Sequence, residues 1–340
     1  MKSFVLILIL FVFCKTGISQ VVSGYIMDKN SRSRISFATI YINGTYVGTS
    51  TDKNGFFKLD ISKKASMPLT VSALGYYSVT LSKYFTDSLN QIYLTPKVFE
   101  LNEVVVTGKS DKERRKENLR RFRNDFLGTS PNSNNCQIIN EDDIRFSFDP
   151  STRIFKAFSV NPIIIINKNL GYKINYFLDK YEFYYPFRAQ ISGTIMGNYQ
   201  FVEDTLNDKN LIRRIEDRRK AAYLGSRMHF FRELWRNNLG SAGFEMKDSL
   251  FIKIDYKKIV VESKREGDPD VSKFLNYNGK IYIGYHDNLY VTIIRINKDH
   301  IFFNKDGFFD PLGIVWEGEM SNQRIGDLLP FEYSPGLPKH

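Results

Sequence analysis

The four histidines are where a search for chemistry in this sequence begins. They stand at His229, His286, His300 and His340. A zinc peptidase needs closely spaced histidine and carboxylate ligands that leave one coordination position of the metal open. The sequence contains no His-Glu-x-x-His motif, and the interval from His229 to Glu233 has the wrong length for the shorter zinc motifs. We therefore expect His229 to be a structural histidine that packs or caps.

Two further motifs resemble known sites and lack essential parts. The run Gly240-Ser241-Ala242-Gly243 contains a serine, but a nucleophile elbow needs glycine two residues earlier, where Leu239 stands. This run predicts a loop that ends a helix. Asp52 and Asn54 before Gly55 lack the remaining acidic ligands of a calcium loop, so they predict a turn. No phosphate-binding loop of the form G-x-x-x-x-G-K-[ST] occurs.

Carboxylates occur in two groups. Glu141, Asp142 and Asp143 precede a strand-like run, and Asp179 and Glu182 flank an aromatic run. The two carboxylates of a glycoside hydrolase usually come from distant strands, so spacing alone cannot reveal such a pair. We interpret both groups as solvated acids of turns.

The aromatic run between these acids has two interpretations. Core and cross-strand packing is the first, and a sugar-stacking platform or an interface is the second. The residues concerned are Tyr176, Phe177, Tyr181, Phe183, Tyr184, Tyr185 and Phe187.

The first residues have the three parts of a secretory signal. Lys2 supplies the charge, residues 4–13 are apolar, and residues 17–19 are a small-residue cleavage site. The apolar run is too short to span a membrane. The sequence therefore predicts a signal peptide over residues 1–19, and an exported protein of the periplasm or outer membrane.

The two cysteines bear on this prediction. Cys14 follows the apolar run as in a lipoprotein, but Phe13 is bulky where a lipobox has a small residue, so we favour cleavage after residue 19. Cys136 would then be the single cysteine of the mature chain, which excludes an intramolecular disulfide. Its strand-like surroundings predict a buried, unreactive thiol.

Composition and charge narrow the class of protein. The 340 residues are 42% hydrophobic and 15% aromatic, which predicts two folded domains rich in strands rather than disorder. The net charge of +11 would suit nucleic acid, but export argues against that partner. Acidic envelope polymers and anionic lipid head groups are more accessible, and solubility alone is the other explanation.

Residues 20–108 read as seven or eight short strands with turns every 8 to 12 residues, the pattern of an antiparallel sandwich. The segment 48–59 is its densest part, and we interpret it as a hairpin whose turn begins at Asp52 and ends at Gly55. The expected strands are 21–27, 36–42, 46–50, 56–61, 69–73, 76–81, 91–94 and 103–107.

This pattern resembles the carboxypeptidase regulatory-like domain, a transthyretin-like sandwich. The family often has proline where this chain has Ser36. The resemblance implies a non-catalytic accessory domain that accompanies peptidases, TonB-dependent receptors and proteins of unknown role. The matching pieces are the strand from Gly24 to Asp28, the strand 37–40, the segment 48–56, the run 71–76 and the closing run 101–108.

The rest of the chain predicts a second, α+β domain. Residues 109–127 read as a charged linker and a short amphipathic helix, residues 128–325 as the domain, and residues 326–340 as an irregular tail. The apolar run 163–166 predicts a central strand covered on each side. The segment 208–239 is helical in pattern, and Gly225 with Ser226 as N-cap predicts two helices there.

Strands are expected on both sides of these helices. Their ranges are 136–139, 144–148, 154–160, 162–167, 172–177, 181–185, 189–201, 250–256, 258–261, 280–285, 289–296, 301–303 and 313–316.

This second region also resembles the body of a group of exported bacterial proteins that carry the same N-terminal sandwich. The resemblance implies architecture and compartment and no activity. It rests on residues 126–128, Cys136 and the runs 170–174 and 222–230.

Together these observations predict a non-enzymatic exported protein that acts as a binding or assembly module of the cell envelope. We assign no catalytic, cofactor-binding or metal-binding residue, and we expect an envelope protein or glycan as partner, possible association with the outer membrane, and no nucleic acid. A hydrolase of envelope glycan or peptide is the alternative, with His229, Glu233 and Asp179 as its candidates. A further alternative is an accessory of TonB-dependent receptors, because residues 103–108 resemble the junction before a receptor plug.

Overall fold

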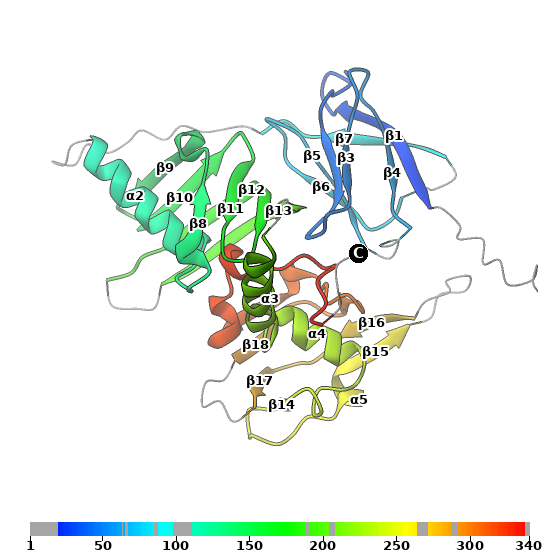
Figure 1. Ribbon diagram of the computed structural model, residues 1–340, viewed down its shortest axis with the longest axis vertical. Coiled ribbons are helices and arrows are strands. Elements are labelled where there is room, and N and C mark those ends of the chain that lie inside the picture. Colours follow the sequence, from blue (N-terminus) through cyan, green and yellow to red (C-terminus); the bar gives the residue numbers. More distant parts are fainter. Residues whose placement is uncertain are drawn as a thin grey trace, which may run out of the picture. The chain divides into compact units, whose positions relative to one another are not determined.

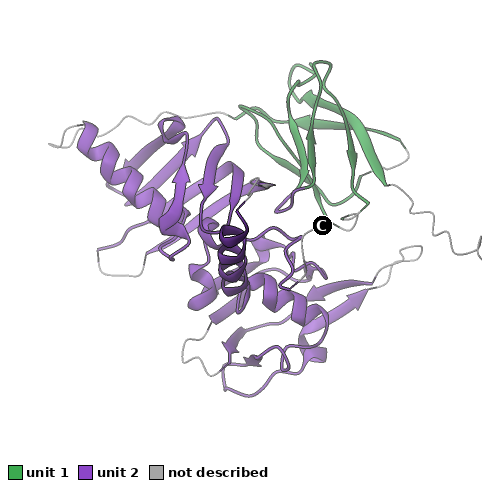
Figure 2. Ribbon diagram, viewed as in Figure 1, with its two compact units in different colours: residues 1–42, 47–97 green, residues 43–46, 98–340 purple. Residues whose placement is uncertain are grey.

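The computed structural model describes residues 20–62, 64, 67–84, 88–97, 111–187, 191–203, 208–263, 271–286 and 292–336. The chain divides into two compact units (Figure 2). Unit 1 comprises residues 1–42 and 47–97, and unit 2 comprises residues 43–46 and 98–340. The described residues are mainly strand, which confirms the predicted fold class.

Unit 1 is a sandwich of two sheets. One sheet has the order β4-β1-β7 and the other the order β3-β2-β5-β6 (Figure 1). Side chains alternate between buried and half-buried along β1, as expected for a strand with one face on a core. The expected strand at 103–107 lies outside the described residues. The strands are β1 (Val21–Asp28), β2 (Thr39–Ile42), β3 (Gly48–Ser50), β4 (Phe56–Asp60), β5 (Leu69–Ser72), β6 (Val79–Leu81) and β7 (Leu89–Leu94).

One strand pair departs from the antiparallel arrangement. β1 and β7 run parallel, with Gly24 opposite Asn90. A Cβ atom at Gly24 would lie 2.1 Å from the carbonyl oxygen of Asn90, so the two backbones approach this closely because residue 24 has no side chain. The prediction of a wholly antiparallel sandwich is therefore wrong at this edge.

The segment 48–59 contains the expected turn but is not a hairpin. The Gly55 amide donates to the Asp52 carbonyl at 3.0 Å, and the Asp52 carboxylate accepts from the amides of Asn54 and Phe56. Its two strands, however, join different sheets: β3 pairs with β2, and β4 pairs with β1. The chain thus crosses from one sheet of the sandwich to the other at this turn.

The first part of unit 2 is a six-stranded antiparallel sheet. Its order is β8-β11-β12-β10-β9, and β13 pairs with β12 along the other side (Figure 1). The strands are β8 (Cys136–Ile138), β9 (Ile144–Asp149), β10 (Ile154–Ser159), β11 (Ile163–Asn167), β12 (Tyr172–Tyr184) and β13 (Ser192–Glu203).

β12 is one long strand where two were expected. A β-bulge between Leu178 and Lys180 shifts its register against β13. Before the bulge the buried positions include Tyr172 and Tyr176, and after it they include Tyr181, so the buried set changes from even to odd numbers. The extra residue keeps the aromatic side chains on the core face past the bulge.

Helix α2 (Asp111–Phe126) packs against this sheet and is 16 residues long, rather than short as expected. The Phe122 ring lies 4.9 Å from that of Phe126 and 5.0 Å from that of Tyr181, measured between centroids. The Phe126 ring meets Tyr176 edge-on at 4.9 Å. The helices that follow the sheet in sequence are the expected cover of the apolar strand 163–166, but α2, which precedes the sheet, shares the core of Ile163 and Ile165.

The prediction of two helices after the sheet is confirmed. Helix α3 (Lys209–Tyr223) is followed by α4 (Arg227–Trp235), and the Ser226 side chain accepts from the His229 amide at 3.0 Å as the N-cap of α4. Gly225 between them has φ +76°, a conformation that favours glycine. The spacing of apolar residues along 208–239 predicts that Ile212 is buried together with Ile215 and Tyr223, but Ile212 is exposed.

The last part of unit 2 packs a second core around α4. Its sheets have the orders β14-β17-β18-β20 and β15-β16-β19. The expected strand 250–256 is wrong, because these residues form a loop and the start of a helix, while β14 and β16 were not predicted. The elements are β14 (Phe244–Lys247), α5 (Tyr256–Ile259), β15 (Val260–Ser263), β16 (Ser272–Leu275), β17 (Lys280–Tyr285), β18 (Thr292–Ile296), β19 (Ile301–Phe303) and β20 (Ile314–Glu317).

The C-terminal segment is irregular in backbone, yet it is packed. Leu329 and Tyr333 are buried in the first core of unit 2. The buried Arg232 guanidinium on α4 donates to the carbonyls of Phe331 and Tyr333, at 3.2 and 2.7 Å. The residues beyond 325 therefore belong to the folded unit up to the end of the described chain.

No helix among the described residues combines the length and the apolar character that crossing a bilayer requires.

The packing of α2 gives the first prediction. Phe122 is fully buried, so Phe122→Ala removes a ring and leaves a cavity that should lower the free energy of unfolding by about 3–5 kcal/mol. Urea denaturation followed by far-UV circular dichroism measures this. Asn124→Ala, on the exposed side of the same helix, is the control. Equal stability of the two variants would show that α2 does not cover the core.

Candidate functional site

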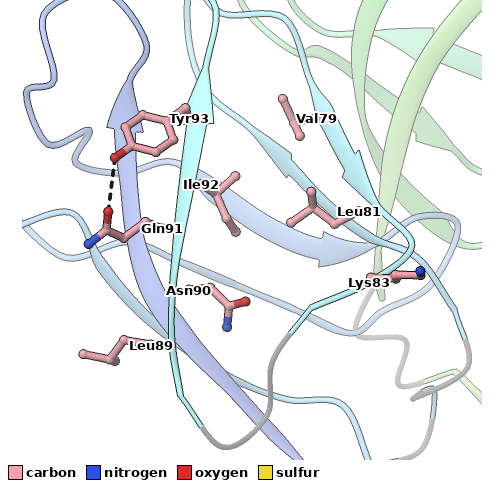
Figure 3. Close-up of a pocket in the computed structure, with 8 residues that line it drawn as sticks. All are labelled: Val79, Leu81, Lys83, Leu89, Asn90, Gln91, Ile92 and Tyr93. Carbon is pink, nitrogen blue, oxygen red and sulfur yellow. Dashed lines mark hydrogen bonds between the residues drawn. The ribbon is translucent and has the colours of Figure 1, made fainter.

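A cleft in unit 1 lies between β6 and β7, which are the end strands of the two sheets (Figure 3). Its volume is about 320 Å³. In the described part of the chain, each of these strands pairs with a neighbour on one side only. The cleft therefore lies between two strands that are each last in their sheet among the described residues.

The alternation of side chains along β7 decides what lines the cleft. Asn90 and Ile92 point from β7 toward Val79 and Leu81 on β6, as Figure 3 shows. Asn90 and Ile92 are 6% and 4% exposed, so they form the floor, whereas Val79 and Leu81 are half-buried. Asn90 does not lie free, because its side-chain amide donates to the Ser23 carbonyl at 2.9 Å. The cleft thus presents a mainly apolar floor.

The outward side chains of β7 form its rim. Tyr93 donates to the Gln91 side chain at 3.1 Å, and the Arg32 guanidinium lies 4.6 Å from the Tyr93 ring centroid. Leu89 is exposed, and Lys83 supplies a positive charge at one end. None of the eight lining residues is a histidine, cysteine or carboxylate, so the arrangement suits binding of an apolar or extended ligand.

Residues 22–106 match the family model described as CarboxypepD_reg-like domain. Unit 1 carries a carboxypeptidase regulatory-like domain. The match confirms the resemblance found in the sequence. No curated protein matches the chain.

The cleft of the regulatory-like domain was not found from the sequence. The alternation from Leu89 to Leu94 was partly visible, but a cleft between two sheets depends on which strands are last in each sheet. The interpretation of 48–59 as a hairpin placed β3 and β4 in one sheet. Gly24 was the one sequence signal for the order β4-β1-β7. Because it has no side chain, the backbone of β7 can lie close to that of β1.

The candidates for chemistry lie in unit 2, and the structure gives His229 a packing role. Its Nδ1 accepts from the Gly225 amide at 3.2 Å. Its ring lies 4.7 Å from Tyr223, 4.9 Å from Phe244 and 5.8 Å from Tyr285, between centroids. Burial lowers the pKa of His229 despite the opposing influence of Glu233, so the neutral ring is favoured.

Glu233 lies one helical turn after His229 and is 6% exposed. Its carboxylate accepts from Arg236 at 2.6 Å and from the Asn238 side chain at 2.8 Å. Both carboxylate oxygens are therefore used to end helix α4. The third candidate, Asp179, is the additional residue at the β12 bulge and accepts from the Asn198 side chain at 3.3 Å. None of the three lines either of the two cavities described in this section.

The other acids of the two carboxylate groups found in the sequence lie in turns or ion pairs. Glu141 pairs with Arg123, and the side chain of Asp142 is fully exposed. Hydrogen bonds from the side chains of Asn140 and Asn161 lower the pKa of Asp143. Glu182, in contrast, lies within β12 rather than in a turn, and it pairs with Lys156 and Lys180 at 3.2 and 2.8 Å.

Cys136 borders a second, polar cavity of about 350 Å³ beside the end of α2. The thiol is half-buried and donates to the Asn132 carbonyl at 3.5 Å. Burial and the nearby Asp327 carboxylate raise its pKa to about 12. The thiol is therefore protonated at neutral pH, which agrees with the prediction of an unreactive group.

The aromatic run divides between the two interpretations. Tyr176, Tyr181 and Phe183 are buried in the core, which confirms packing as their role. Tyr184 and Phe187 are exposed instead, and the Arg153 guanidinium covers the Phe187 ring at 3.6 Å from its centroid. An extended sugar platform is absent among the described residues of this run.

One smaller prediction concerns the loop after α4. Residues around Ser241 form the expected turn after α4, where the Phe244 amide donates to the Leu239 carbonyl at 2.8 Å. Within the described residues, no group of three His, Cys, Asp or Glu side chains could hold a metal ion.

The environment of His229 predicts a pH effect on stability. Its pKa is lower in the folded chain than the ordinary value of 6.5, so the unfolded chain binds a proton that the folded chain excludes. The contribution of neutral His229 to the free energy of unfolding is complete above pH 6.5. It is lost as the pH falls toward the lowered pKa of the folded chain.

Urea denaturation at pH 7.5 and pH 5.5 measures this dependence. His229→Gln should reduce the difference in unfolding free energy between the two pH values, and His300→Gln, at an exposed histidine, is the control. A His229→Gln chain with the full pH dependence of the unmodified chain would contradict a neutral, buried ring.

Proposed function

We propose that this protein is a non-catalytic, exported component of the cell envelope that binds a partner through its regulatory-like domain. The observation that carries the proposal is the cleft between β6 and β7, the end strands of the two sheets in the described part of unit 1. Two strand edges with an apolar floor between them match the requirements of an extended polypeptide. Its backbone can pair with an edge, and its alternate side chains can enter the cleft.

The geometry favours a protein segment over a glycan as the occupant. Three of the side chains that line the cleft, Val79, Leu81 and Ile92, are aliphatic, and sugar rings are held by exposed aromatic rings and by polar groups around them. Tyr93 is the single aromatic residue that lines the cleft, and its hydroxyl already donates to Gln91. Addition of a strand to β7 would instead use the edge of β7 that has no partner strand among the described residues.

The state of the catalytic candidates supports a binding role over a hydrolase. Glu233 has both oxygens occupied by Arg236 and Asn238, and the His229 ring packs among aromatic rings. A general acid or base must be able to reach a substrate proton. The receptor-related alternative rests on residues 103–108, which lie outside the described residues.

Export is the part of the proposal that rests on sequence alone. The signal-like segment 1–19 supports a location in the periplasm or at the outer membrane. An envelope protein is the partner that we propose there.

Site-specific photo-crosslinking tests the binding role of the cleft. A photoreactive phenylalanine analogue replaces Leu89 on the rim, and the same analogue replaces Leu74 in a control chain. These leucines of unit 1 are 58% and 60% exposed, but Leu74 lies outside the cleft lining. Irradiation with an envelope fraction should give a discrete protein adduct from position 89 and at least about tenfold less from position 74.

Equal adducts from both positions, or none from position 89, would contradict the cleft as the binding site. Leu89→Asp places a charge on the rim and should reduce adduct formation from a second analogue at Gln91. Leu89 is exposed, so this substitution should not disturb the fold.

A further inference from the structure

A loop of unit 2 exposes three consecutive large apolar residues. Leu250, Phe251 and Ile252 are 77%, 64% and 59% exposed. No other run of three consecutive large hydrophobic residues is exposed in the part of the chain that the structure describes. The loop lies between β14 and α5, the yellow segment of Figure 1. Large apolar residues exposed side by side mark a surface that another apolar phase covers.

The loop is held in one conformation by its own hydrogen bonds. The Asp248 amide donates to the Ile252 carbonyl at 2.9 Å, and the Phe251 amide donates to the Asp248 carbonyl at 3.0 Å. The Asp248 carboxylate accepts from the amides of Leu250 and Ile252, both at 2.9 Å. Four amide groups are thus satisfied within the loop. Entry into an apolar phase is costly for unpaired backbone donors, so this loop is suited to it.

The backbone conformation of Phe251 also indicates that this loop presents apolar side chains to another phase. Its φ is +59°, a left-handed backbone that strains a bulky side chain and that glycine adopts freely. The strained backbone places the ring at the tip of the loop, where it meets Tyr282 at 5.1 Å between centroids and is otherwise mainly exposed. The site thus holds an aromatic side chain in solvent at a position where folding alone would favour glycine.

Four lysines lie on the segments that flank the apolar tip in sequence or, on β17, near its contact residue Tyr282. Lys253 follows the tip directly, Lys257 and Lys258 lie on α5, and Lys280 lies on β17 two residues before Tyr282. All four are exposed, and no ion pair involves them among the described residues.

The neighbouring acids are already engaged. Asp248 accepts the loop amides, and Asp255 caps α5 through the Lys257 amide at 3.0 Å. Glu245 pairs with Lys247 at 2.8 Å, and Glu262 pairs with Lys273 at 2.8 Å. The two glutamates are paired with lysines, and the four lysines without an ion pair among the described residues outnumber Asp248 and Asp255, so the net charge next to the tip is positive.

We propose that residues 248–253 are a membrane-docking loop that inserts its apolar tip into the interfacial region of an anionic lipid bilayer. A protruding tip needs a shape-matched pocket in a protein partner, whereas a bilayer receives apolar side chains without one. The lysines would then lie at the level of the anionic head groups. This inference concerns unit 2 and is independent of the cleft in the regulatory-like domain.

Vesicle sedimentation tests the proposal with the full chain. The chain should bind vesicles of phosphatidylcholine with 40 mol% phosphatidylglycerol, and it should bind pure phosphatidylcholine vesicles at least about tenfold more weakly. The triple variant Leu250→Ser, Phe251→Ser, Ile252→Ser should lose at least about tenfold in its partition coefficient on the anionic vesicles. Leu312→Ser, at a residue that is 66% exposed elsewhere in unit 2, is the matched control and should bind as the unmodified chain does.

A second variant separates binding from folding. Phe251→Gly relieves the left-handed backbone and should leave the free energy of unfolding unchanged or raised, while it weakens binding to anionic vesicles at least about threefold. All variants retain the N-terminal apolar run, so its contribution is common to them.

Three outcomes would overturn the proposal. The first is equal binding of the triple variant and the Leu312→Ser control to anionic vesicles. The second is equal binding of the unmodified chain to neutral and anionic vesicles. The third is a dimer in light scattering that the triple variant abolishes without any loss of vesicle binding, which would identify a second copy of the chain as the occupant.

Discussion

The first core of unit 2 depends on strand β12, which pairs with β10, β11 and β13 at once. A strand of 13 residues would turn its aromatic side chains away from the core partway along if its twist and register were uninterrupted. The bulge at Leu178 and Lys180 prevents this. Tyr176 and Tyr181, on the two sides of the bulge, therefore both contact α2, and Asp125 on that helix accepts hydrogen bonds from Tyr181 and Tyr185. The position of the helix follows from the bulge.

The parts of the fold that could be predicted are those that local chemistry determines. Ser226 at the start of α4 and the turn from Asp52 to Gly55 follow from the hydrogen-bonding capacity of single side chains and from the conformational freedom of glycine. Pairing between strands is not local. The segment 48–59 therefore gave the correct turn and the wrong partner strands, because two strands beside a turn look alike whether they share a sheet or not.

Errors in unit 2 have a similar origin. Residues 250–256 are apolar enough to suggest a strand, but the Asp248 carboxylate binds the amides that a strand would use for pairing. The Asp248 side chain thus prevents the strand that the apolar residues after it suggest. The expectation that His229 is a structural histidine agrees with its surroundings, since its ring packs on three aromatic residues. The cleft could not be foreseen, because it depends on the strand order of two sheets.

The close approach of Gly24 to the Asn90 carbonyl has a consequence for how this domain can evolve. Any side chain at position 24 would collide with backbone, so that position cannot drift without loss of the β1–β7 pairing. The outward residues of β7 are not restricted in this way. Their side chains border the cleft and do not lie between the backbones of β1 and β7. These residues are Leu89, Gln91 and Tyr93. Substitutions at these three positions thus leave the β1–β7 pairing intact, so the surface around the cleft can change while the scaffold beneath it stays the same.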